Sequence, residues 1–221
     1  MSCIDCIFIL REEKGWNTQG SLLLDGGNEN KKINLQKVIF WPDNIVQHFK
    51  TFRVKSSFDL LSVDTDSYDF FMLEAILEAG YVPRVIIVEY NANFEITEAK
   101  SIMPPPDGEK HILHFKNNYF SVEGKSWVRW DGTTYQGMSL LAVSYLFNRF
   151  SYSLVWCNKV NCIGVRDKVL GFPLRRAASE FLGPRLDQHR CDDQNREMAV
   201  IGRDGTWNGT LDDGEGSPHI R

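Results

Sequence analysis

The chain lacks the features that mark several specialised classes of protein. Its 221 residues contain no block of Lys and Arg, and the formal net charge is −4. Nothing therefore favours binding to nucleic acid or to an anionic membrane surface. No apolar run approaches the roughly 18 residues that cross a bilayer. Residues 1–16 also lack the basic start and the cleavage site of a signal peptide. We predict a protein without a membrane span and without a nucleic-acid partner.

Cysteine is also scarce. The five cysteines are an odd number for a disulfide framework, so we predict reduced thiols and a cytoplasmic location. Cys3 and Cys6 have the spacing of half a zinc site, but Cys157 and Cys162 are too loosely spaced to make a convincing second half. The sequence therefore predicts no metal centre built from these thiols.

The composition that remains is typical of one soluble globular domain. Apolar residues make up 43% of the chain and charged residues 24%, and a domain of this length needs no disulfide or metal to fold. We assign this domain to residues 1–186. Within it, residues 92–134 are predicted to be a long loop or lid insertion. Residues 187–221 are polar and are predicted to be a mostly disordered tail.

The most informative stretch is 58–94. An apolar run over 60–63 stops at Asp64, a helical pattern follows over 68–79, and a second apolar run over 85–88 stops at Glu89. Strand, helix and strand in this order predict a βαβ unit with parallel strands. The runs are nearly continuous, as expected for strands covered on both faces. Because open α/β sheets bind ligands where their strands end, we predict an acidic site at this edge.

The flanking segments extend the same pattern. Residues 21–25 and 36–40 are predicted strands, and a helix is expected to run from Pro42 to Phe49. A further helix is predicted over 135–150. It is followed by two short strands, within 152–158 and 161–167, that can pair only as an antiparallel hairpin.

These blocks resemble, in this order, the FkbM-type methyltransferase-like family, which has the class I S-adenosylmethionine-dependent methyltransferase fold. The resemblance covers roughly 15–167 and is carried by LLLDGGNEN, FDLLSVDTDSYDFFMLEAIL, PRVIIVEYNANF, WDGTTYQGMSLLAVSYLFNRFSYSLVWCN and NCIGVRD. It implies a Rossmann-like sheet that is mostly parallel with a C-terminal antiparallel hairpin. It also implies S-adenosylmethionine as cofactor and O-methylation of a small molecule or glycan.

The resemblance also implies roles for the residues at the strand ends. Asp25 would accept hydrogen bonds from the cofactor ribose, through charge-assisted bonds that are about twice as strong as neutral ones. Asp64 and Asp66 would lie where the methyl group meets the substrate, with Asp64 also near the cofactor. Glu89 and Asn91 would line the same edge, Glu89 as a catalytic and Asn91 as a substrate-binding residue.

Two further candidates flank the predicted helix start at Gly137. Tyr135 and Ser139 are placed where they could hydrogen-bond a substrate. The alternatives are that Tyr135 packs in the core and that Ser139 caps the helix.

The carboxylates also have alternatives. Asp25 could be a turn residue before Gly26, and Asp66 or Ser67 could cap the helix that starts near Tyr68. Glu89 is harder to explain in this way, because an ionised carboxylate at the end of a buried strand must find partners or shift its pKa.

A metal is the third possibility for the same residues. Asp64 and Asp66, with Asp69, could hold Mg²⁺ or Mn²⁺ for a nucleotide-sugar or phosphate substrate, because these ions prefer hard oxygen ligands.

The N-terminus departs from the family pattern. Residues 1–20 contain only Gly15 and Gly20, and neither belongs to a glycine-rich loop after a strand. Residues 7–16 fit the helix that follows that loop in the family, although the apolar part alone is also compatible with a short strand. We therefore expect the first strand and its loop to be missing, through truncation or loss of the cofactor site.

Three functions stay open on these grounds: an active methyltransferase, a catalytically inactive interaction module of the same fold, or a metal-dependent transferase using Asp64 and Asp66. A missing strand would leave backbone groups unpaired, which predicts low stability or self-association.

Overall fold

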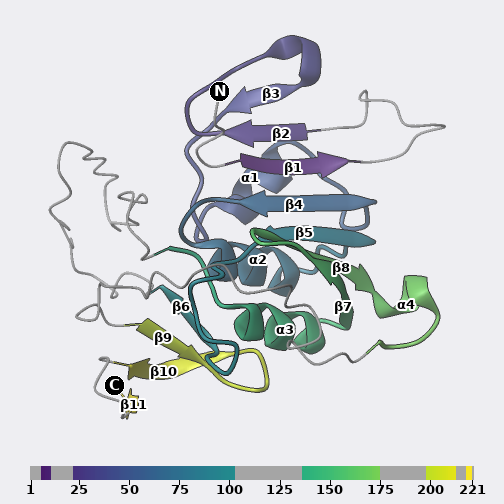
Figure 1. Cartoon of the computed structure of the whole chain (residues 1–221). Helices are drawn as coiled ribbons and strands as arrows, with labels where there is room; N and C mark the ends of the chain where they lie inside the picture. The colour runs from purple at the N-terminus through teal and green to yellow at the C-terminus, as the bar shows by residue number, and fades with distance from the viewer. Residues whose placement is uncertain (1–5, 11–21, 103–135, 175–197, 213–217, 221) are drawn as a thin grey trace, which may run out of the picture.

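The computed structural model describes residues 6–10, 22–102, 136–174, 198–212 and 218–220 (Figure 1). Within these ranges the chain forms a seven-stranded sheet with helices packed on it, and a separate four-stranded sheet. The architecture is mixed α/β, as predicted.

The large sheet has the strand order β3-β2-β1-β4-β5-β8-β7. Its strands are β1 (Cys6–Leu10), β2 (Leu22–Asp25), β3 (Leu35–Lys37), β4 (Leu60–Asp64), β5 (Val85–Glu89), β7 (Tyr152–Cys157) and β8 (Asn161–Arg166). β2 is parallel to β3 and β4 is parallel to β5, whereas β1 is antiparallel to both of its neighbours and β8 is antiparallel to β5 and β7. Five strands therefore run one way, and β1 and β8 run the other. The βαβ unit and the antiparallel hairpin are confirmed.

β1 corrects the prediction for the N-terminal residues. Cys6 lies opposite Asp25 on one side and Asp64 on the other, so β1 fills the space between β2 and β4 (Figure 1). Residues 6–10 are thus a strand and not part of a helix. The physical reason is that two neighbouring strands offer backbone partners to a short apolar segment, and Ile7 is completely buried there. No open edge is left beside β4, so the reason for expecting self-association is absent.

The described helices are α1 (Ile45–Thr51), α2 (Asp69–Glu78), α3 (Leu140–Arg149) and α4 (Asp167–Leu170), with a 3-10 turn η2 (Lys31–Ile33). Three of them, α1, α2 and α3, match the predicted positions with small shifts, whereas α4 and the 3-10 turn were not predicted. None of the described helices has the length and apolar character needed to cross a membrane.

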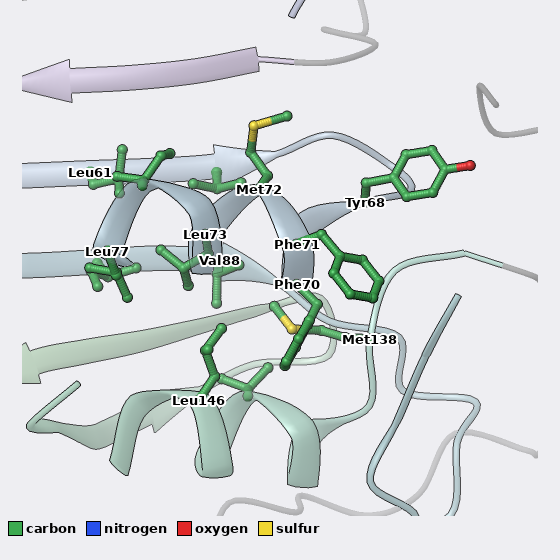
Figure 2. Close-up of a cluster of buried hydrophobic side chains, with 14 of the residues drawn as sticks. Leu61, Tyr68, Phe70, Phe71, Met72, Leu73, Leu77, Val88, Met138 and Leu146 are labelled. Carbon is green, nitrogen blue, oxygen red and sulfur yellow. The ribbon is translucent and has the colours of Figure 1, made fainter. Parts of the chain in front are cut away.

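The core lies between one face of the large sheet and the helices α2 and α3. Leu61 and Val88 project from β4 and β5 toward Met72 and Leu73 of α2 and Leu146 of α3 (Figure 2). Along both strands buried residues alternate with half-buried ones. The helix-facing side therefore holds the tightly buried residues, and the other face, which was also predicted to be covered, is half-buried.

The second sheet corrects two further predictions. β6 (Lys100–Ile102), β9 (Met198–Ile201), β10 (Trp207–Asp212) and β11 (Pro218–Ile220) pair in the order β11-β10-β9-β6. The predicted disorder of 187–221 is wrong for these strands, and the predicted loop or lid insertion over 92–134 contains a strand, β6. Ala199 and Ile201 are buried, and Trp207 meets Phe71 of α2 edge-on at 6.0 Å between ring centroids. Burial against the domain therefore orders a polar segment. Residues 103–135 lie outside the described ranges.

Candidate site at the carboxyl ends of β4 and β5

Three carboxylates meet where β4 and β5 end. Asp64 is the last residue of β4, Glu89 is the last residue of β5, and the two strands are parallel neighbours. Asp66 reaches the same place from the loop after β4. Oxygen atoms of the three side chains lie within 4.8 Å of one another, and all three residues are half-buried. The structure thus brings together the three residues that the sequence analysis names as catalytic.

The loop from Asp64 to α2 holds these groups in place. Asp66 has a φ of 54°, a left-handed conformation that Asp tolerates better than most residues. Oδ1 of Asp69 accepts a hydrogen bond from the Thr65 backbone N–H at 2.9 Å, and the Ser67 hydroxyl donates to the Thr65 carbonyl at 3.0 Å. No side chain caps α2 at its N-cap residue, Tyr68. Neither Asp66 nor Ser67, the two residues weighed as caps, therefore occupies the N-cap position of this helix.

Asp69 also belongs to this group, although the sequence analysis names it only as a possible metal ligand. It is completely buried, and its Oδ2 atom has no hydrogen-bond partner among the described residues. That atom faces Gly137, where an added Cβ would lie 3.9 Å from it. Burial raises the pKa of Asp69 to about 7, partly opposed by the Thr65 N–H and reinforced by the charge of Asp64. The Thr65 hydroxyl also lowers this pKa slightly, without making a hydrogen bond that satisfies Oδ2.

Glu89 carries the largest pKa shift of the group. Burial raises the pKa of Glu89 to about 9, and the charges of Asp69, Asp64 and Asp66 and a hydrogen bond with Asp64 act in the same direction. Its Oε2 atom is buried and has no hydrogen-bond partner in the described part of the chain. In the absence of a bound cation, the burial and the neighbouring charges therefore favour the protonated form of Glu89.

Unpaired oxygens accumulate at this edge. Besides Asp69 and Glu89, the buried Oε1 atom of Gln136 lacks a hydrogen-bond partner in the described ranges. The Gln136 backbone lies beside the end of β5, because its carbonyl accepts a hydrogen bond from the Asn91 side chain at 3.0 Å. Buried polar atoms are paired in the great majority of cases. The Thr65 hydroxyl is also buried without a hydrogen-bond partner among the described residues.

Asp25 lies at the same edge but apart from this group. β1 separates its strand from β4, which places the two strand ends roughly 10 Å apart at ordinary strand spacing. Asp25 is buried, and its Oδ1 atom accepts hydrogen bonds from the backbone N–H groups of Gly27 at 2.6 Å and Asn28 at 2.7 Å. The carboxylate thus stabilises the turn that follows β2. This is the role of Asp25 as a turn residue that the sequence analysis gave as an alternative.

Asn91 joins β5 to the segment before α3. Its backbone N–H donates to the Met138 carbonyl at 2.8 Å, and its side chain bonds Gln136 and the Asn93 N–H. Both polar atoms of this buried side chain have protein partners, so its observed contacts are structural.

Ser139 is also buried and has structural contacts. Its hydroxyl oxygen accepts hydrogen bonds from Ala142 N–H at 3.2 Å and Lys100 N–H at 3.0 Å, which caps α3 and ties it to β6. The capping alternative is therefore observed. Tyr135 lies outside the described residues.

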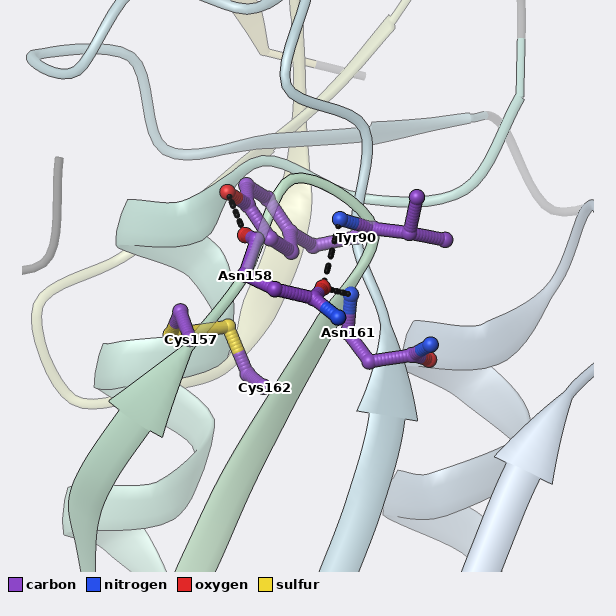
Figure 3. Close-up of a disulfide and its surroundings, with 6 residues drawn as sticks. Tyr90, Cys157, Asn158, Asn161 and Cys162 are labelled. Carbon is purple, nitrogen blue, oxygen red and sulfur yellow. Dashed lines mark hydrogen bonds between the residues drawn. A yellow bond between two sulfur atoms is a disulfide. The ribbon is translucent and has the colours of Figure 1, made fainter. Parts of the chain in front are cut away.

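A disulfide between Cys157 and Cys162 joins β7 to β8 (Figure 3). The two residues are cross-strand partners in the hairpin. The prediction of reduced thiols is wrong for this pair, because strand pairing brings together two cysteines that sequence counting treated as independent.

The tip of this hairpin borders the site. Tyr90 donates a hydrogen bond from its hydroxyl to the Asn158 carbonyl at 2.6 Å, and the Asn158 side chain accepts the Asn161 N–H at 2.5 Å (Figure 3). Asn161 is the strand partner of Glu89. The tip is therefore held against the end of β5.

Comparisons with protein-family models, with curated proteins and with solved structures found no match. Any assignment of function therefore depends on the geometry of the site. A group of half-buried carboxylates beside a buried one can bind a cation or exchange a proton with a ligand hydroxyl.

Proposed function

We propose that the protein is a methyltransferase-like enzyme that moves a methyl group from S-adenosylmethionine to a hydroxyl of a small molecule or glycan. The observation that carries this proposal is the convergence of Asp64, Asp66 and Glu89 at the carboxyl ends of adjacent parallel strands. This is the edge at which open α/β sheets bind their ligands. The order β3-β2-β1-β4-β5 is also that of five of the six strands of a doubly wound nucleotide-binding sheet, although β1 runs in the opposite direction.

The proposed chemistry is a direct displacement. When bound, S-adenosylmethionine would supply the methyl group, which would pass from sulfur to the acceptor oxygen while S-adenosylhomocysteine leaves with the electron pair. Asp64 orients the acceptor hydroxyl and takes its proton. Glu89, whose pKa is raised, donates a hydrogen bond to the acceptor.

Calorimetric titration of the full chain with S-adenosylmethionine and with S-adenosylhomocysteine tests this proposal. We expect micromolar binding of both, and methyl transfer to a hydroxyl acceptor that is lost in Asp64→Asn. Asp59→Asn, at the other end of β4, is the matched control and should retain activity. Absence of heat at millimolar ligand, from a chain shown by circular dichroism to be folded, would refute the proposal.

A catalytically inactive interaction module is the second candidate, and the direction of β1 favours it. In doubly wound sheets the loop that follows the first strand approaches the cofactor at the carboxyl edge. Here β1 runs the opposite way, so its last residue, Leu10, lies at the other edge. Asp25 is engaged in a turn. Folded protein without cofactor binding is the result that this candidate predicts.

A further inference from the structure

We propose that Asp64, Asp66 and Glu89 form a binding site for one hard divalent cation of the Ca²⁺, Mn²⁺ or Mg²⁺ class. The proposal concerns binding and does not depend on methyl transfer. It follows from the distances between the carboxylates, from the unpaired oxygens beside them and from the position of the site in the sheet.

The distances suit a single ion. Two oxygens bound to one ion can be separated by at most twice the ion–oxygen distance, which is about 4.6–5.2 Å for Ca²⁺ and about 4.2 Å for Mg²⁺. The three carboxylates place oxygens within 4.8 Å of one another. A point between three such oxygens lies at most about 2.8 Å from the farthest of them, so Ca²⁺, with bonds of about 2.3–2.6 Å, requires only a small inward movement of the side chains, and Mg²⁺, with bonds of about 2.0–2.1 Å, requires a larger one.

The chemistry of the three groups selects hard ions. All are carboxylates, which prefer Mg²⁺, Ca²⁺ and Mn²⁺ to softer metals. Each side chain is half-buried, so the site is open enough for water or an oxygen atom of a ligand to complete the coordination shell.

A second observation is independent of the cluster itself. Asp69 is completely buried beside Asp64 and Glu89, close enough for their charges to act on one another, and its Oδ2 atom has no hydrogen-bond partner among the described residues. Leaving a buried acceptor unpaired costs about 1–3 kcal/mol. A cation on the neighbouring carboxylates offsets this cost, because it supplies the positive charge that the surrounding acceptors lack.

The strand arrangement explains why these residues meet. β4 and β5 are parallel and adjacent, so Asp64 and Glu89 leave the sheet side by side. The left-handed conformation of Asp66 turns the loop at the same point, while Asp69 anchors the loop through the Thr65 N–H. Two ligands thus come from strand ends and one from a loop that is pinned to the helix.

Calorimetry and manganese electron paramagnetic resonance test this site on the full chain, treated with EDTA and desalted. MnCl₂, CaCl₂ and MgCl₂ are titrated separately. We expect one saturable site per chain and a rise in thermal stability on binding. Asp66→Asn and Glu89→Gln should each weaken binding at least about tenfold, which is the scale of effect seen even for residues that only support metal ligands.

Two controls separate loss of a ligand from loss of the fold. Asp59→Asn removes a carboxylate at the opposite end of β4 and should bind like the natural chain. In EDTA, Glu89→Gln should be at least as stable as the natural chain, because it removes a crowded carboxyl group, but it should gain less stability when Mn²⁺ is added.

Absence of saturable binding to the folded natural chain would overturn the proposal. Equal, weak binding by the natural chain and by all three variants would also overturn it, because it would indicate only general attraction to an acidic surface. Titration of the chain with S-adenosylmethionine in EDTA is scored separately, so failure of methyl-donor binding and failure of the cation site are distinguishable.

Discussion

Two groups of carboxylates lie along α2, and they differ in whether the protein provides their counter-charge. Toward the end of the helix, Glu74 and Glu78 each form an ion pair at 2.5 Å with Arg149 of α3. Asp69 at the start of the helix and Glu89 at the neighbouring end of β5 have no Lys or Arg within ion-pair distance in the described part of the chain.

The pKa directions show what this difference does. Glu74 and Glu89 are both half-buried, and burial raises the pKa of each. At Glu74 the bond to Arg149 opposes the shift. At Glu89 three neighbouring carboxylates and a hydrogen bond with Asp64 add to it. Arg149 thus neutralises the charge of the first group of carboxylates within the protein. The charge of the second group can be neutralised only by bound protons or by a bound cation.

The largest expected effect is a pH dependence of the cation-free protein. The pKa of Asp69 is raised to about 7 and that of Glu89 to about 9, whereas unfolded carboxyls titrate near about 4. Between these values the folded chain binds more protons than the unfolded chain, so stability falls as pH rises. In EDTA we expect unfolding free energy to decrease from pH 4 to pH 9, by at most about 1.4 kcal/mol per pH unit for Asp69.

Urea denaturation at a series of pH values measures this dependence. Asp69→Asn and Glu89→Gln should each flatten the curve, because each removes one of the titrating groups. If the stability of the natural chain in EDTA is constant or rises over this range, the two carboxyls are ionised in the folded state. That result would contradict the difference between the two groups of carboxylates.

A smaller effect is expected when Arg149, the ion-pair partner of Glu74 and Glu78, is replaced. Arg149→Met should lower the unfolding free energy by about 2 kcal/mol, because Glu74 loses its partner in a half-buried position. Arg84→Met breaks a more exposed pair with Asp59 and should cost less than about 1 kcal/mol. Equal stability of the two variants in urea denaturation would mean that burial does not distinguish these ion pairs. Adding Glu74→Gln to Arg149→Met should recover part of the loss.

A further expected effect, smaller than that of Arg149→Met, concerns the hairpin tip beside Glu89. Replacing Cys157 and Cys162 by Ser removes a cross-link over a very short loop and should cost about 1–2 kcal/mol in urea denaturation. We also expect one pair of thiols in the unfolded natural chain to react with a maleimide only after reduction. Full reactivity of all five cysteines without reductant would contradict the disulfide.

The local sequence patterns correctly predict the βαβ unit and the hairpin. Apolar runs over 60–63 and 85–88, separated by a helical pattern, led directly to β4, α2 and β5. Because the ends of adjacent parallel strands must lie together, the meeting of Asp64 with Glu89 could also be predicted. The burial of Asp69 cannot be predicted from the sequence, because it depends on how α2 packs.

The amino-acid sequence by itself determined the elements whose signals lie within a few residues: the strands that end in carboxylates, the helices and the short hairpin. Only the tertiary structure decided the direction of β1, the pairing of β6 with β9 and the partners of each carboxylate. β6 and β9 are about a hundred residues apart, so no local pattern reports their pairing. Periodicity describes one segment at a time, whereas burial, charge balance and strand direction depend on segments that meet only when the chain folds.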